Sequence, residues 1–348
     1  MKLKFCKTLC FLMSFSCIII FSGMTNVKAA TSTKPTLAFD SSGNFKIVQF
    51  SDIQDGPNTN PNTLALMNKI LDYEKPNLVI LTGDNIDGRC TSAADVQKAI
   101  TNIAQPMETR KIPWAIVFGN HDDEHGKMTK TQMMNFYMTF SCNLSQIGYK
   151  TYDRIGNYNL LVKSSKSTTP VFNIYMLDSG KYFSGGYDYI KTTQIDWYKK
   201  TASSLKTKYG KTIPAFMFFH IPLPEYYTAF QTGYVDGERY ETECSPTFNS
   251  GLFSTVVKTG DVKGVFVGHD HANTYSANLN GIRLGYAGSV GYATYTSSSL
   301  LRGRGARVFQ ISEANPSSIN TWLRCANDVE LNPTSIYTFL SSSALSKK

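Results

Sequence analysis

The chain has 348 residues, is 42% hydrophobic and 13% aromatic, and carries a formal net charge of +9. This length and composition are those of a globular protein that buries a substantial core. The basic charge is mild and dispersed, which argues against a nucleic-acid-binding protein and is compatible with an anionic substrate.

The first 29 residues have the pattern of a Sec-type signal peptide. Lysines precede an apolar run from Leu9 to Met24, and small residues up to Ala29 supply a cleavage site. The leader contains four lysines and no acidic residue, so its removal lowers the formal net charge from +9 to +5. We therefore expect a secreted protein with no membrane contact after cleavage. The alternative is an uncleaved membrane anchor.

Hydrophobic periodicity predicts one mixed α/β domain over residues 45–338, preceded by a lead-in at 30–44 and followed by a frayed tail at 339–348. Predicted strands cover residues 45–50, 78–81, 114–118, 159–162, 171–177, 215–219, 265–267, 282–286 and 306–311. Predicted helices cover residues 61–75, 92–106 and 192–208. The first three strands alternate with helices, which predicts parallel pairing between neighbours.

Metal-ligand side chains follow five of these apolar strands. They are Asp52 and Gln54, Asp84, Asn120 and His121, His220, and finally His269 and His271. Each residue taken alone is more often structural. Four of the five histidines nevertheless occur at such strand ends, and parallel strands bring their carboxyl ends to one edge, where open α/β folds place ligands.

These residue types suit two divalent cations that share a carboxylate, for which Asp84 is the natural bridge. A water between the cations loses its proton near neutral pH and attacks a phosphoryl group whose oxygens the cations neutralise. A nearby imidazole, for which His121 is the candidate, can protonate the leaving alkoxide.

The order Asp-x-Gln, Gly-Asp-Asn, Gly-Asn-His-Asp, His and Gly-His-x-His resembles the calcineurin-like metallophosphoesterase superfamily. The local sequences are most similar to its single-domain branch, which includes plant purple-acid-phosphatase-like proteins and fungal relatives. The resemblance implies a four-layer α/β/β/α sandwich with mixed sheets. It also implies one metal held by Asp52, Gln54, Asp84 and His271, and another held by Asp84, Asn120, His220 and His269.

Other site residues follow from the same resemblance. His121 would lie over the leaving group, and Asn120 and His121 would contact the substrate phosphate. We expect Asp122 to orient an imidazole and not to bind metal.

Two positions depart from the superfamily pattern. Gln54 stands where a histidine is usual, so the first site is expected to be weaker or to prefer a harder ion such as Mn²⁺. Asp87 stands where purple acid phosphatases carry a metal-binding tyrosine, so the identity of the metals, Mn, Fe or Zn, stays open.

The sequence thus predicts a secreted, metal-dependent phosphoesterase that hydrolyses a small phosphorylated substrate, with a phosphomonoester favoured. A phosphodiesterase or nucleotide hydrolase on the same site is one alternative. A catalytically weak, exported phosphate-ligand binding protein is an alternative of another class, suggested by Gln54. Arg302, Arg304 and Arg307 are expected in a solvated loop, with phosphate contact as the alternative.

Overall fold

The computed structural model describes residues 34–151, 154–294 and 304–329. The predicted leader at 1–29 and the predicted tail at 339–348 lie outside these residues. Among the helices that the structure describes, none is long and apolar enough to cross a membrane.

The first large sheet has five strands: β1 (Asn44–Phe50), β2 (Leu78–Thr82), β3 (Trp114–Val117), β13 (Gly305–Ser312) and β14 (Asn320–Cys325). Their order across the sheet is β14-β13-β1-β2-β3. The strands β1, β2 and β3 are parallel neighbours, which confirms the predicted pairing, whereas β13 is antiparallel to both β1 and β14.

The second large sheet has seven strands: β4 (Tyr158–Lys163), β5 (Pro170–Met176), β8 (Ala215–Phe218), β9 (Val235–Asp236), β10 (Val262–Val267), β11 (Ser276–Leu279) and β12 (Ile282–Tyr286). Their order is β4-β5-β8-β10-β12-β11-β9, with a parallel centre from β5 to β12. A separate small hairpin consists of β6 (Tyr182–Phe183) and β7 (Gly186–Tyr187).

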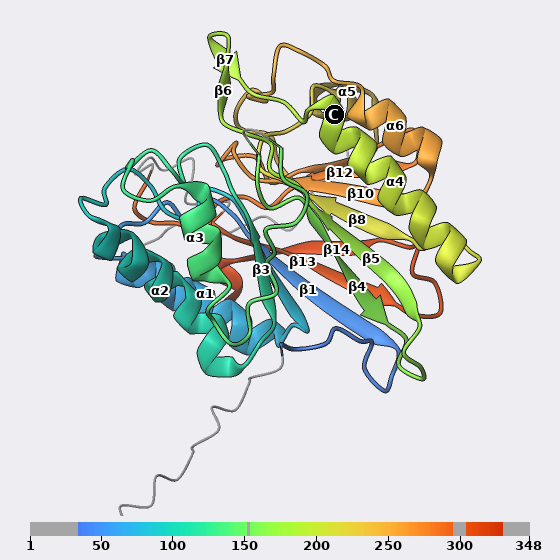
Figure 1. Cartoon of the computed structure of the whole chain (residues 1–348), viewed down its shortest axis with the longest axis horizontal. Coiled ribbons are helices and arrows are strands. Elements are labelled where there is room, and N and C mark those ends of the chain that lie inside the picture. Colours follow the sequence, from blue (N-terminus) through green and yellow to red (C-terminus); the bar gives the residue numbers. More distant parts are fainter. Residues whose placement is uncertain (1–33, 152–153, 295–303, 330–348) are drawn as a thin grey trace, which may run out of the picture. The chain divides into compact units, whose positions relative to one another are not determined.

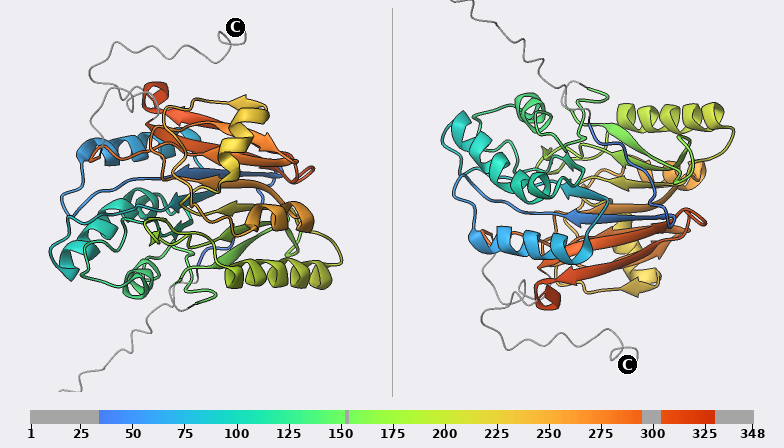
Figure 2. Two further views of the ribbon diagram at one scale, coloured as in Figure 1. Left: turned by 90° about the horizontal axis from the view of Figure 1, so that it is seen from above. Right: turned by 90° about the horizontal axis from the view of Figure 1, so that it is seen from below.

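Helices cover the outer face of each sheet (Figures 1 and 2). The five-stranded sheet is covered by α1 (Pro61–Glu74), α2 (Ala93–Arg110) and α3 (Lys130–Tyr137). The seven-stranded sheet is covered by α4 (Thr192–Tyr209), α5 (Glu225–Thr232) and α6 (Leu252–Thr259). A 3₁₀ helix, η1 (Ala326–Val329), follows β14. The predicted four-layer α/β/β/α sandwich is confirmed.

The inner strands are mainly apolar because both of their faces are largely buried. In β1, Phe45 and Ile47 belong to the cluster between the two sheets, whereas Val48 and Phe50 pack in the cluster beneath the helices. The same alternation holds in β2, where Ile80 faces the other sheet. The sandwich therefore has three apolar layers, and the middle one joins the sheets.

Local signals fix the ends of α1. The side chain of Asn60 accepts a hydrogen bond from the amide of Asn62, and Pro61 occupies a position where its missing N–H costs nothing. The helix ends at Lys75, which adopts a left-handed conformation before Pro76.

Two local predictions were wrong. The second helix does not end at Pro106 but continues to Arg110, because the flanking Ile103 and Met107 are buried in the core and their packing outweighs one lost main-chain hydrogen bond. Arg304 and Arg307 are buried and do not lie in a solvated loop. Arg302 lies outside the described residues.

The segment that precedes β1 contributes to the core. Leu37 and Phe39 are buried in the cluster between the sheets. The amide of Phe39 donates to the carbonyl of Lys163, at the end of β4. Residues 34–44 therefore join the edge of the seven-stranded sheet to the first strand of the other.

Glu74 ties the end of α1 to two strands of the neighbouring sheet. Its buried carboxylate accepts hydrogen bonds from Lys46 at 3.0 Å, from Arg324 at 2.7 Å and from the indole of Trp322 at 3.2 Å. Burial opposes ionisation, but these three donors hold the pKa of Glu74 below its ordinary value of 4.5.

We expect Glu74→Gln to lower the free energy of unfolding by about 1–3 kcal/mol near neutral pH, because the partly buried cations of Lys46 and Arg324 lose their carboxylate partner. The ionised carboxylate stabilises the fold above its ordinary pKa, and this contribution is lost as pH falls through the lower native value. Urea unfolding should therefore show a difference in the free energy of unfolding between the wild type and Glu74→Gln that becomes smaller in acid. Asp72→Asn, in an exposed pair with Arg110, is the control and should cost little. A difference in unfolding free energy that does not change with pH would contradict the stabilising role assigned to the ionised carboxylate of Glu74.

Candidate active site

Five loops that follow strands bring the predicted metal ligands together. Asp52 and Gln54 follow β1, Asp84 follows β2, Asn120 and His121 follow β3, His220 follows β8, and His269 and His271 follow β10. The first three strands are parallel neighbours in one sheet, and the last two are parallel neighbours in the other. The site therefore lies where the carboxyl ends of the parallel strands of both sheets come together (Figure 1).

Asp84 lies at the centre of this group and is buried. Its Oδ2 is 3.1 Å from Nε2 of His220 and accepts a hydrogen bond of 3.1 Å from Nε2 of Gln54. Its Oδ1 accepts a hydrogen bond of 2.8 Å from the amide of His121. One carboxylate is thus contacted from both sheets.

Asp52 occupies the second acidic position. Its Oδ1 is 3.3 Å from Nε2 of His271, and both carboxylate oxygens accept from the amide of His269, at 3.1 and 3.2 Å. Nε2 of His220 lies 4.0 Å from the same Oδ1. Asp52 is therefore held by the loop that follows β10, as Asp84 is held by the loop that follows β3.

The donor atoms form two groups that share one carboxylate. In one, the ligand atoms of Asp52, Asp84 and His271 lie within 4.8 Å of one another, and in the other those of Asp84, His220 and His269 do. Nε2 of His220 is also 3.1 Å from the amide oxygen of Asn120. The structure thus gathers all seven predicted ligands, and Asp84 has the shared position that the sequence predicts for the bridge.

Backbone strain is concentrated at these ligands. Asp52, Gln54, Asp84 and His269 have positive φ angles of 53°, 43°, 48° and 77°. Left-handed conformations cost non-glycine residues of order 1–3 kcal/mol each, and they persist only where the surrounding structure enforces them. Four in one site indicate that the fold holds these side chains in set directions.

Glycines allow the loops to approach each other closely. A Cβ atom on Gly119 would lie 2.1 Å from Oδ1 of Asp84, and one on Gly268 would lie 1.8 Å from Oγ of Ser51. Neither contact is possible for a larger residue. This explains the glycine that begins Gly-Asn-His-Asp and the one that begins Gly-His-Asp-His.

The buried acidic and imidazole groups of the site shift one another's pKa values. Burial lowers the pKa of His220, but the carboxylates of Asp84 and Asp52 raise it to about 9. Burial and the neighbouring His220 lower the pKa of His269 to about 3. Burial opposes ionisation of Asp84, yet the imidazoles of His220 and His121 hold its pKa below the ordinary value. The carboxylates of Asp84 and Asp52 therefore favour positive charge among the groups around them.

This donor set fits divalent cations. Nδ1 of His269 lies 3.3 Å from Nε2 of His220, so two ring nitrogens face one another beside the Asp84 carboxylate. Two lone pairs in this arrangement need a proton or a cation between them. Carboxylate, imidazole and amide donors are those that Mn²⁺, Fe²⁺ and Zn²⁺ accept.

Asp122 holds together the loop that follows β2 and the loop that follows β3. Its carboxylate accepts hydrogen bonds from the main-chain amides of Gly119 at 2.7 Å, Asn85 at 3.0 Å and Ile86 at 3.1 Å. These main-chain partners differ from the imidazole that the sequence suggested. Burial and the nearby Asp84 raise the pKa of Asp122 to about 7. Its observed contacts position the loops that carry Asp84 and Asn120.

Glu124 is the partner of His121 that sequence reasoning missed. Nδ1 of His121 is 2.6 Å from Oε2 of Glu124. The hydroxyl of Tyr182, in the β6–β7 hairpin, donates to Oε1 of Glu124 at 3.0 Å and lies 3.3 Å from Nδ2 of Asn120. The spacing of His121 and Glu124 by three residues was the available signal.

The site opens into a cavity of about 480 Å³. Its lining includes the predicted ligands Gln54, Asp84, His269 and His271 together with His121. The ring of Tyr187, in β7, also lines it and packs edge-on against His269 with 4.3 Å between ring centres. The metal-ligand side chains therefore face a space large enough for a small phosphorylated molecule.

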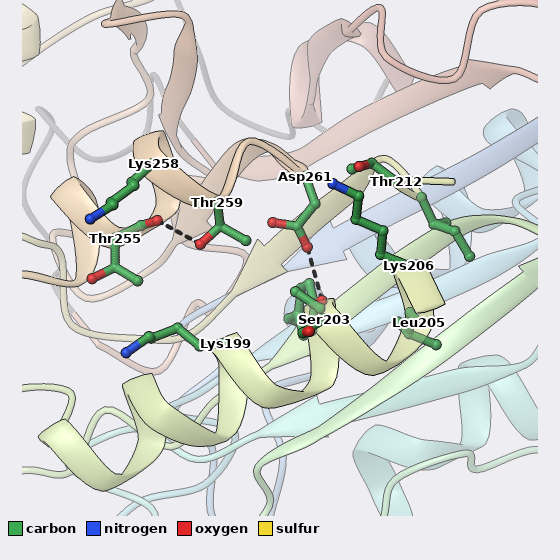
Figure 3. A pocket seen from close by; sticks show the side chains of 12 residues that line it. Lys199, Ser203, Leu205, Lys206, Thr212, Thr255, Lys258, Thr259 and Asp261 are labelled. Atoms are coloured by element: carbon green, nitrogen blue, oxygen red, sulfur yellow. Dashed lines mark hydrogen bonds between the residues drawn. The ribbon is translucent and has the colours of Figure 1, made fainter. Parts of the chain in front are cut away.

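A second cavity, of about 430 Å³, lies between α4 and α6 (Figure 3). Lys199 and Lys206 line it from α4, and Lys258 lines it from α6. Its carboxylate, Asp261, accepts hydrogen bonds from two tyrosine hydroxyls, and its lining contains neither histidine nor cysteine. This cavity offers no group of metal ligands, so we place the candidate active site at the cavity lined by Asp84 and His121.

The two-sheet sandwich and the donor groups that share Asp84 are those of a metallophosphoesterase. A family model described as calcineurin-like phosphoesterase matches residues 45–273. The chain therefore belongs to the calcineurin-like phosphoesterase family, and it is a hydrolase of the class that acts on phosphoric ester bonds.

Relatives support this assignment. The chain is 35% identical to "Probable inactive purple acid phosphatase 14" of Arabidopsis thaliana, over 81% of this chain and 79% of the relative. It is 33% identical to "Phosphatase DCR2" of Saccharomyces cerevisiae, over 86% of this chain and 56% of that protein. A dimetal phosphatase from Danio rerio shares the fold, with a TM-score of 0.51, 14% identity, and coverage of 80% of this chain and 98% of that one.

Gln54 generates a prediction about metal affinity. Only the oxygen of its amide can ligate a cation, and here its nitrogen donates to Asp84. We expect Gln54→His to raise the affinity for Zn²⁺ by about tenfold or more, because imidazole is the stronger donor to that ion and histidine tolerates a positive φ.

Metal content after dialysis against a graded chelator, measured by elemental analysis, tests this. Gln54→Ala is the matched control and should lose affinity. Equal Zn²⁺ retention by the wild type and both variants would show that residue 54 is not a ligand.

Proposed function

We propose that the protein is a secreted phosphoesterase that depends on two divalent cations and prefers small phosphomonoesters. The observation that carries this proposal is the pair of donor groups sharing Asp84 beside a cavity that His121 also lines. Export is proposed from the leader at residues 1–29. Nucleic acid is not expected as a partner.

The chain's side chains supply a place for each cation. Asp52, Gln54, Asp84 and His271 would hold one, and Asp84, Asn120, His220 and His269 would hold the other. When bound, such a pair supplies an activated water as the nucleophile and neutralises phosphoryl oxygens. The strained backbone and the close contacts around Gly119 and Gly268 keep these donors in place without rearrangement.

His121 is placed to transfer the proton that the leaving oxygen needs. Its Nδ1 is taken by the carboxylate of Glu124, while its Nε2 lies 4.0 Å from Oδ2 of Asp84 at the cavity. A ring held through Nδ1 can deliver a proton only from Nε2. Glu124 thus sets the orientation of His121 and stabilises its cationic form, and Tyr182 in turn holds Glu124.

A binding protein with weak turnover is the competing hypothesis. Three relatives carry "Probable inactive" in their names, and Gln54 is the weakest donor of the set. Against this hypothesis, Asp84, Asn120, His121 and His220 are linked by direct contacts in the structure. A site that only bound phosphate would have no need of an oriented His121.

We expect the purified protein, loaded with Mn²⁺, to hydrolyse 4-nitrophenyl phosphate faster than bis(4-nitrophenyl) phosphate and to lose both activities with EDTA. Asp84→Asn should abolish metal-dependent turnover, because the shared ligand loses its charge. His121→Ala should slow hydrolysis of an alkyl phosphate by about 10²–10⁴-fold with metal content unchanged, and it should slow hydrolysis of 4-nitrophenyl phosphate less.

Three outcomes would count against the proposal. Full activity in both variants would remove the assigned roles. Tight phosphate binding with two equivalents of metal and no turnover would favour the binding protein. Faster hydrolysis of the diester would replace the monoesterase with the phosphodiesterase alternative.

Glu124→Gln tests the orientation of His121. An alkyl phosphate needs its leaving oxygen protonated, whereas 4-nitrophenolate does not, so we expect a loss of roughly tenfold or more on the alkyl ester and a small loss on the nitrophenyl ester. The steady-state rate constants for both esters at matched metal occupancy give the comparison.

Asp123→Asn is the matched control, since this neighbouring acid pairs with Lys181 and does not contact His121. It should affect both esters equally and weakly. An equal loss on both esters in Glu124→Gln would mean that Glu124 acts on folding or metal binding and not on proton transfer.

A further inference from the structure

A third group of metal-ligand atoms lies beside the two already described. Sγ of Cys244, a ring nitrogen of His269 and a carboxylate oxygen of Asp270 lie within 4.8 Å of one another. All three residues line the cavity of the proposed active site. Cys244 has no role in the proposed hydrolysis.

Two of the three side chains are already held in place. Asp270 is buried, and its carboxylate accepts hydrogen bonds from the amide of Cys244 at 3.1 Å and from the hydroxyl of Tyr286 at 2.7 Å. His269 has Nδ1 beside His220, whereas its buried Nε2 has no hydrogen-bond partner among the described residues. A cation in this group would therefore meet a fixed carboxylate and an uncommitted imidazole nitrogen.

The donors differ in kind from those of the dinuclear groups. A thiolate, an imidazole and one carboxylate select thiophilic ions such as Zn²⁺ or Cd²⁺ over Mn²⁺. The carboxylates of Asp270, Glu241 and Glu243 lie near the thiol of Cys244. These negative charges attract a divalent cation, and the thiol releases its proton when it binds one.

Cys244 is also the accessible thiol of the described chain. It is partly exposed at the cavity, whereas Cys90, Cys142 and Cys325 are buried, and none of the four forms a disulfide. A soluble cation that enters the cavity can reach this sulfur directly.

We propose that Cys244, His269 and Asp270 form a separate site for a thiophilic divalent cation, and that filling it inhibits hydrolysis. A neutral imidazole has one lone pair, so His269 that binds through Nε2 keeps a proton on Nδ1 and is lost to the dinuclear centre. The inhibitory role rests on the proposed phosphoesterase function, whereas binding at the site does not.

Binding is tested with Cd²⁺ added to the Mn²⁺-loaded protein after removal of the leader, which carries Cys6, Cys10 and Cys17. The ultraviolet charge-transfer absorption of a Cd²⁺–thiolate bond should rise and saturate at one equivalent. This absorption should be absent in Cys244→Ser and Cys244→Ala. It should be retained in Cys142→Ala, because Cys142 is buried away from the cavity. No saturable band in the wild type, or an equal band in the Cys244 variants, would overturn the site. Thermal melting confirms that each variant is folded.

Inhibition is tested with Zn²⁺ on the same Mn²⁺-loaded proteins. Cys244→Ser should keep the basal rate and need about tenfold more Zn²⁺ for half-inhibition. Identical Zn²⁺ inhibition of both proteins would overturn the inhibitory role. A Cd²⁺–thiolate band in a protein that hydrolyses no phosphate ester would overturn the proposed function and support the metal site alone.

Discussion

The carboxylate of Asp84 is the point on which the site depends, because groups from both sheets meet at it. Gln54 and the amide of His121 reach it from the five-stranded sheet, and His220 reaches it from the seven-stranded sheet. Nearby, Gln49 of β1 spans the same gap and donates to the carbonyl of Val267 in β10. The site therefore exists only when the two sheets are packed together, and any cation that binds it also stabilises the sandwich.

The cost of this arrangement is met by the apolar layers around it. Buried charges, left-handed ligands and close glycine contacts are each unfavourable in isolation. They are tolerated because the strands that precede them are buried on both faces and cannot shift. Rigidity at the centre is the condition for donors that need not rearrange when a ligand arrives.

Strand ends were predictable from the sequence because a fully buried strand leaves a continuous apolar run, and ligands follow such runs directly. Contacts that depend on tertiary packing were not predictable. The main-chain partners of Asp122 and the burial of Arg307, which donates to the carbonyls of Tyr286 and Thr274, leave no periodic signal. The short β6–β7 hairpin lacks the length for one, so the contact of Tyr182 with Glu124 emerged only from the structure.

The cavity is built from two kinds of backbone. Part of its lining consists of residues fixed within a few positions of a strand end, such as Asp84 and His269, whereas Tyr187 comes from the short β6–β7 hairpin and Glu241 from the long connection between β9 and α6. Connections of this type accept insertions and substitutions far more readily than strand ends do. Selection can therefore reshape which molecules enter while the ligand set stays constant, so substrate range would diverge within the family faster than the chemistry.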